Sequence, residues 1–262
     1  AAEGIVCQDC HMTPGPGVTK PNPGKAASTG PDREHIYTMT FAGGNVALGD
    51  AAKAEERLKA AAELVLDLPE VVESGDVALK TTITNVGAGH YLPTGLTEVR
   101  QMWLEVTAID ESGQQLLSER REFGTVMKDA AGNYPAEMWD AAAVHTDDRI
   151  PPRESTSNEY GFPMAQGAVT VKAALYYRSC PEELAAKAKV DVPTTTIAEV
   201  TKVVSPSAEA MEAGVAAAEE ATQAEAEEPK AGPAPIVFVL VAAGALALAA
   251  VAFLLFRRRS AA

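Results

Sequence analysis

Three stretches of the chain, residues 77–83, 102–108 and 169–177, alternate apolar side chains with mostly polar ones. A period of two is typical of a β-strand with one face buried and the other in water. Segments rich in Gly, Asn, Asp and Pro separate these stretches, and no helical pattern lies between them. The pattern therefore predicts an antiparallel β-sandwich at about residues 70–180.

A helical period precedes the strands, at residues 50–66. Asp50 is a suitable N-cap, and Leu58, Ala62 and Val65 share one face. We therefore expect one helix ahead of the sandwich.

Residues 1–48 show little periodicity and contain many Gly and Pro residues, so this segment cannot build an ordinary apolar core. If the segment is ordered, a large apolar body other than its own side chains must order it. A bound apolar cofactor would be such a group, so we expect a cofactor site in or near this segment.

The far end of the chain has two further segments. Residues 181–234 are rich in Ala, Glu and Pro and are expected to form an acidic stalk, because they cannot bury enough apolar surface to fold alone. Residues 236–256 carry no charged or polar side chain and are long enough to cross a bilayer as a helix. The arginines at 257–259 are expected to stay in the cytoplasm. We thus expect a transmembrane helix with a basic stop-transfer segment at 235–259, and the rest of the chain on the periplasmic or extracellular side; a buried core helix is the alternative.

Charge and cysteine count narrow the function classes. The net charge of −14 argues against a nucleic-acid partner, because phosphate binding needs a basic patch. Three cysteines, an odd number, do not build a disulfide framework. The chain begins with Ala-Ala-Glu and shows no signal-peptide core, so we expect a processed protein or the C-terminal part of a longer one.

A Cys-x-x-Cys-His motif, formed by Cys7, Cys10 and His11, is the attachment signature of c-type haem. Each thiol adds to one haem vinyl group, and the adjacent histidine supplies an iron ligand. The alternatives fit less well. Structural zinc needs four ligands, a thioredoxin-like dithiol starts a helix after a strand, and a Cys7–Cys10 disulfide leaves His11 without a role.

Three residues are candidates for the other axial iron ligand. His35 lies in the Gly- and Pro-rich segment, Met39 follows four residues later and offers a thioether, and His90 lies in a turn between strands. His90 has an alternative role as a hydrogen-bonded histidine of a structural turn. The residues alone leave this choice open.

Several motifs follow one another in a distinctive order: "CQDCHM", "FAGGN" at 41–45, "NVGAGHYLPTG", "RQMWLEV", "DRIPPRE" and "ALYYR". Over about residues 4–180 the chain resembles the C-terminal part of multihaem c-type cytochromes, in which a haem region precedes a β-sandwich. The resemblance implies electron transfer, bis-histidine haems, and further haems on sequence before residue 1. It implies that His90 is an iron ligand, with His35 or His90 serving either this haem or a haem on the upstream sequence. Met39 stands where family members often have a histidine, so that either His35 substitutes, a haem is His/Met-ligated, or a site has been lost.

The expected fold class is mainly β: an antiparallel β-sandwich, preceded by a loop-rich haem segment with one helix at 1–69 and followed by the stalk and a C-terminal transmembrane helix. The expected function is a membrane-anchored, extracytoplasmic c-type cytochrome with at least one covalent haem c. It would pass electrons to redox partner proteins or to other haems of the same assembly. Two alternatives are the terminal part of a multihaem oxidoreductase acting on small nitrogen or sulfur compounds, and a non-redox surface-binding sandwich. Electron transfer is favoured over catalysis, because the sequence shows no convincing catalytic cluster.

Overall fold

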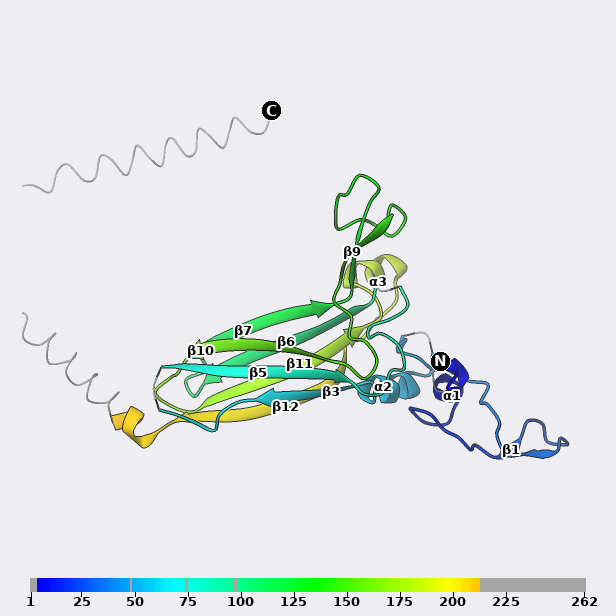
Figure 1. Ribbon diagram of the computed structural model, residues 1–262, viewed down its shortest axis with the longest axis horizontal. Coiled ribbons are helices and arrows are strands. Elements are labelled where there is room, and N and C mark those ends of the chain that lie inside the picture. Colours follow the sequence, from blue (N-terminus) through cyan, green and yellow to red (C-terminus); the bar gives the residue numbers. More distant parts are fainter. Residues whose placement is uncertain (1–3, 48, 74, 97–98, 213–262) are drawn as a thin grey trace, which may run out of the picture. The chain divides into compact units, whose positions relative to one another are not determined.

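Two β-sheets pack face to face in the computed structural model, which describes residues 4–47, 49–73, 75–96 and 99–212 (Figure 1). The three-stranded sheet has the order β10 (Ser155–Pro163), β5 (Asp76–Asn85) and β3 (Ala62–Asp67). The five-stranded sheet has the order β4 (Val71–Val72), β12 (Thr195–Pro206), β11 (Val169–Arg178), β6 (Gln101–Asp110) and β7 (Gln115–Phe123). Neighbouring strands are antiparallel except β4 and β12, which run parallel.

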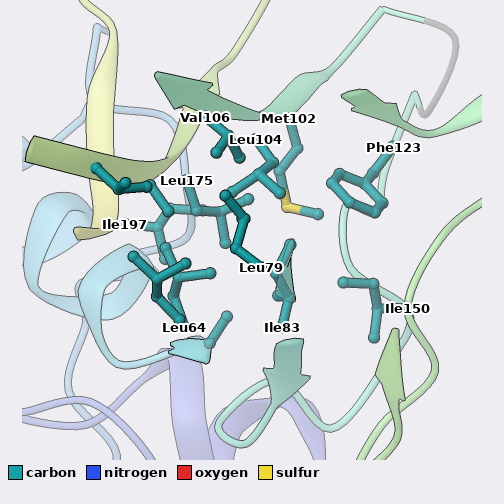
Figure 2. Close-up of a cluster of buried hydrophobic side chains, with 14 of the residues drawn as sticks. Leu64, Leu79, Ile83, Met102, Leu104, Val106, Phe123, Ile150, Leu175 and Ile197 are labelled. Atoms are coloured by element: carbon teal, nitrogen blue, oxygen red, sulfur yellow. The ribbon is translucent and has the colours of Figure 1, made fainter. Parts of the chain in front are cut away.

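Side chains from both sheets share one apolar core (Figure 2). Leu79 and Ile83 of β5 lie in it together with Leu104 of β6 and Leu175 of β11, which are opposite each other in the strand register. Fully burying an aliphatic side chain of this size contributes about 1.5–3 kcal/mol. The alternation along β5, β6 and β11 thus directs one face of each strand into this core.

Three short helices, two small ribbons and a helical stretch at 208–212 complete the described residues. The helices are α1 (Cys7–His11), α2 (Ala51–Lys59) and α3 (Glu182–Ala188). The first ribbon pairs β1 (Gly24–Lys25) with β2 (Asp32–Arg33) in the N-terminal segment. The second pairs β8 (Thr125–Lys128) with β9 (Ala143–Asp147) and lies between β7 and β10 in the sequence.

The helix expected over residues 50–66 is shorter, because its second half forms a strand. Asp50 accepts a hydrogen bond from the Lys53 N–H (3.1 Å) and caps α2, which ends at Lys59. After α2 the chain forms β3, in which buried residues, Leu64 and Leu66 among them, alternate with exposed ones. This strand pairs with β5. Burial of both leucines in the shared core outweighs the helix propensity of the Ala, Glu and Leu residues in this segment.

Part of the expected acidic stalk belongs to the sandwich. Within residues 181–206 the chain forms α3 and then β12, which pairs along its length with β11. Ile197 and Val204 of β12 are buried in the core. This stretch is rich in Thr and Val, which favour strands, and pairing with β11 gives it a buried face that its composition alone does not reveal. Residues 213–234 lie outside the described residues.

The fold class expected from the sequence included a transmembrane helix, and this part of the expectation is corrected. Among the described residues, no helix is long and apolar enough to cross a membrane. The longest, α2, has nine residues, which span about 14 Å, roughly half of a hydrocarbon core. The segment expected to span, 236–256, lies outside the described residues. The described chain is mainly β, and its helices α1, α2 and α3 are all short.

Truncation tests the place of β12 in the sandwich. A chain that ends at Lys189 loses the strand between β4 and β11, and with it two buried apolar side chains, so we expect no cooperative unfolding in urea. A chain that ends at Glu212 keeps every described strand and should unfold at the urea concentration of the full chain. Tryptophan fluorescence follows both. Cooperative unfolding of the shorter chain would contradict this assignment.

Candidate haem site

A buried carboxylate anchors α1, the helix formed by the Cys-x-x-Cys-His motif. Asp9 is fully buried and accepts hydrogen bonds from the Val6 N–H (2.8 Å) and the Tyr37 hydroxyl (2.9 Å). It also forms an ion pair with Lys20, with an N···O distance of 2.7 Å. The hydrogen bond from Lys20, followed by that from Val6, lowers the pKa of Asp9 to about 2. A variable position of the motif thus fastens α1 to the segment that follows it.

Arg57 of α2 holds the other end of α1. Its guanidinium donates hydrogen bonds to the carbonyls of Cys10 (3.3 Å), Thr13 (2.9 Å) and Gly15 (3.1 Å). The last carbonyls of a helix lack partners within the helix, and an arginine side chain can satisfy them. The sequence alone does not reveal this role, because Arg57 is one of several charged residues on α2 and no local pattern distinguishes it.

His11 is oriented by the segment around Ala42. The His11 Nδ1 lies 2.6 Å from the Ala42 carbonyl oxygen, and the Ala42 N–H donates back to the His11 carbonyl at 3.0 Å. A carbonyl oxygen only accepts, so the proton of the imidazole is on Nδ1 and its lone pair is on Nε2. The Phe41 ring lies nearly parallel to the imidazole, with ring centres 4.9 Å apart. The "FAGGN" segment therefore sets both the tautomer and the orientation of His11.

A buried amide shapes the turn that carries His90. Asn85, the last residue of β5, has no exposed surface, and its Nδ2 donates to the carbonyls of His90 (2.9 Å) and Ile150 (3.0 Å). Its Oδ1 accepts the Ala88 N–H at 3.1 Å. One side chain thus satisfies three backbone groups and holds the turn against the sandwich.

The structure brings together His11, at the end of α1, and His90, in the turn after β5. Their ring centres lie 6.3 Å apart and their planes differ by 9°. The His90 Nδ1 lies 2.9 Å from the Tyr91 carbonyl oxygen, so it donates there and leaves a lone pair on Nε2. Both histidines therefore have the same tautomer and nearly parallel ring planes.

The spacing of the two rings fits two histidines that would hold one iron between them. Metal–imidazole bonds are about 2 Å long, so two Nε2 ligands on opposite sides of one metal have ring centres about 6 Å apart. The two rings match this spacing. A ligating histidine commonly donates its other ring N–H to a carbonyl, as both histidines do here.

Both motif cysteines are free thiols on α1, the helix that ends with His11. Cys7 is exposed, and Cys10 is half-buried. Burial raises the pKa of Cys10; the charge of Asp9 raises it further, and that of Arg57 opposes them. The helix thus presents two thiols and the histidine within one short segment, as covalent haem attachment requires.

The other two ligand candidates have different surroundings. The Asn22 N–H donates to the His35 Nδ1 at 3.1 Å, so the proton of this imidazole is on Nε2, which is buried without a hydrogen-bond partner among the described residues. The His35 ring packs edge-on against Tyr37, with centres 4.7 Å apart. Met39 is 95% exposed. His35 thus lacks the free Nε2 lone pair that His11 and His90 share, and the side chain of Met39 lies in solvent.

The zinc alternative finds no support among the described residues. They contain no group of three or more His, Cys, Asp or Glu side chains arranged to hold a metal ion. Structural zinc requires four such ligands. A haem iron needs only axial ligands from the protein, because the macrocycle supplies the other nitrogens.

Acid should loosen the anchor of α1. Because the pKa of Asp9 lies below its ordinary 3.8, its contribution to stability is complete above about pH 4 and is lost as the pH falls toward 2. Hydrogen exchange of the Val6 amide, corrected for its intrinsic pH dependence, should therefore accelerate across that window. Asp9→Asn should abolish this acceleration, whereas Asp32→Asn, at an exposed carboxylate of the same segment, should retain it. An unchanged acid response in Asp9→Asn would refute the anchoring role.

A solved structure of a multihaem cytochrome resembles this chain in fold. No protein-family model matches the chain, and no curated protein matches it. A penta-heme cytochrome c552 from Thermochromatium tepidum is 24% identical, with a TM-score of 0.53 over 77% of this chain and 48% of that chain. The chain thus spans about half the length of that cytochrome.

Other solved structures match less well. A putative beta-galactosidase from Bacteroides fragilis is 12% identical, with a TM-score of 0.28 over 54% of this chain and 16% of that one. The sporulation control protein Spo0M from Bacillus subtilis is 12% identical, with a TM-score of 0.24 over 62% and 56% of the two chains. Such low scores support no conclusion. The likeness to the cytochrome shows that this chain shares the fold of part of a multihaem cytochrome c.

Proposed function

We propose that the chain is an electron carrier that holds one c-type haem on Cys7, Cys10, His11 and His90. The observation that carries this proposal is the pair of parallel imidazoles, 6.3 Å apart, with Nδ1 of each ring hydrogen-bonded to a carbonyl. When bound, a haem iron with two histidine ligands supplies one-electron redox chemistry. The fold shared with part of a multihaem cytochrome gives further, weaker support.

The chain's own residues hold the two ligands in place. The carbonyls of Ala42 and Tyr91 fix the ring orientations and raise the basicity of each Nε2. Arg57 ties the helix of His11 to α2, and Asn85 ties the turn of His90 to the sandwich. The two ligands thus come from separately anchored segments, which limits how far they can move when the charge at the site changes.

Filled axial positions favour electron transfer over catalysis. A multihaem oxidoreductase needs an iron with an open position for its substrate. With His11 and His90 as the two ligands, this site leaves none. The alternative of a non-redox sandwich leaves the shared tautomer and spacing of the two rings unexplained.

Partners and location follow from the same proposal. An electron carrier exchanges electrons with redox partner proteins or with other haems of its assembly, and further haems on upstream sequence are one source. Covalent attachment of c-type haem takes place outside the cytoplasm, so we place this domain there. The membrane location suggested by residues 235–259 stays a prediction from the sequence.

Covalent haem content is the first test. After periplasmic expression with haem-attachment machinery, the denatured chain should retain one haem per molecule in a pyridine haemochrome assay. Cys7→Ala combined with Cys10→Ala should abolish retention, whereas Cys180→Ala should not, because Cys180 lies outside the motif. A folded wild-type chain without retained haem would overturn the proposal and favour the surface-binding sandwich.

The identity of the second ligand is tested by spin state. The wild-type ferric protein should be low-spin, and His90→Ala should convert it to a high-spin species at neutral pH, because one axial position opens. His35→Ala is the matched control and should stay low-spin, because the Nε2 of His35 carries a proton. A high-spin His35→Ala beside a low-spin His90→Ala would reverse the assignment, and a high-spin wild-type protein would favour the oxidoreductase.

A further inference from the structure

The ribbon formed by β8 and β9 stands apart from the two sheets. It includes residues 125–147, and Figure 1 shows it in green, projecting beyond the ends of the strands. All five residues of β9 are exposed. The ribbon therefore contributes little to the core, and its sequence is free to serve another purpose.

Large apolar side chains are exposed along this ribbon. Trp139 is 76% exposed and Met138 is 45% exposed, and Tyr134 and Val144 are also exposed. Trp, Tyr and Met are the residue types enriched where proteins bind one another, and a buried tryptophan often dominates the binding energy. Several such residues on one projecting element mark an interaction surface rather than scattered surface residues.

Negative charge surrounds the two central apolar residues. Glu137 and Asp140 flank Met138 and Trp139 directly in the sequence, and both carboxylates are exposed. Asp129 adds to the ribbon's charge, against a single lysine within 125–147. A partner that fits this surface has an apolar pocket with a basic rim, because opposite charges steer the encounter and fix its orientation.

The base of the ribbon is joined to the turn that carries His90. Arg149, two residues after β9, pairs with Asp147 through two hydrogen bonds of 2.6 and 2.7 Å. Its guanidinium lies over the Tyr91 ring, 4.9 Å from the ring centre. Ile150 then exchanges two backbone hydrogen bonds with Leu92 (2.8 and 2.9 Å). The base of the ribbon is thereby tied to the segment that supplies the second histidine.

We propose that the β8–β9 ribbon is the docking surface for a basic redox protein, with Trp139 and Met138 as its apolar anchor and Glu137 and Asp140 as its acidic rim. This inference rests on the proposed electron-carrier function. It adds the chemistry of the partner and the surface that receives it.

Binding of a small basic haem protein tests the surface. The probe is oxidised mitochondrial cytochrome c, and the sample is the full chain whose haem content has been established by the haemochrome assay. Biolayer interferometry at two salt concentrations gives the dissociation constant and the association rate. We expect Met138→Ala combined with Trp139→Ala to weaken binding about tenfold or more. Glu137→Gln combined with Asp140→Asn should slow association and flatten its salt dependence.

The chain offers a matched control in Glu70-Val71-Val72-Glu73, which has the same pattern of two apolar residues between two acidic ones. This segment precedes the start of β5, whereas the turn of His90 follows its end. Val71→Ala, and Glu70→Gln combined with Glu73→Gln, should leave the binding constant and its salt dependence unchanged. These control variants also show whether loss of negative charge or of apolar surface elsewhere on the protein weakens binding of the probe in the same way.

Three outcomes overturn the docking proposal. In the binding assay these are a haem-loaded chain that does not bind the probe, and ribbon variants that bind it as well as the control variants do. The third is a dimer of this chain, detected by sedimentation, that Trp139→Ala dissociates. The last would assign the surface to a second copy. A chain that carries no haem would instead overturn the proposed function, so the two failures are distinguishable.

Discussion

The buried amide of Asn85 is the contact on which the rest of this region depends. It lies at the end of β5, inside the sandwich, and bonds to the turn of His90 on one side and to Ile150 on the other. An unsatisfied buried polar group costs about 1–3 kcal/mol, so this side chain strongly favours the one geometry in which all its partners are present. The candidate ligand and the base of the ribbon are thus positioned by the same residue.

The N-terminal segment is held in a different way from the sandwich. The sandwich is stabilised by apolar burial between two sheets. The segment around α1 is held mainly by polar contacts: the carboxylate of Asp9, the guanidinium of Arg57 and the backbone pairing of His11 with Ala42. Its exposed apolar side chains, Phe41 among them, are those that a flat apolar group could cover. Under the proposed function, haem would bridge these two unlike parts, with thioethers on one and a histidine ligand on the other.

A haem held in this way would also give a reason for the position of the proposed docking ribbon, whose base contacts the turn of His90. A redox protein gains most from a surface that holds it next to the ligand-bearing turn, and Arg149 links the two through Tyr91 and Asp147. The acidic ribbon would raise the rate of encounter with a basic partner, and the apolar tip would prolong contact.

The sequence by itself determined the features that are written in adjacent residues. The alternation in 77–83, 102–108 and 169–177 identified β5, β6 and β11, because the side-chain period of a strand is local. The motif of Cys7, Cys10 and His11 identified a candidate attachment site, because its spacing is its signal. Only the tertiary structure decided the rest. Residues 62–67 and 195–206 became strands because each found a partner strand and a buried face. His90, rather than His35, faces His11 because Asn85 and Ala42 orient two segments far apart in the chain, and no local pattern encodes such a contact.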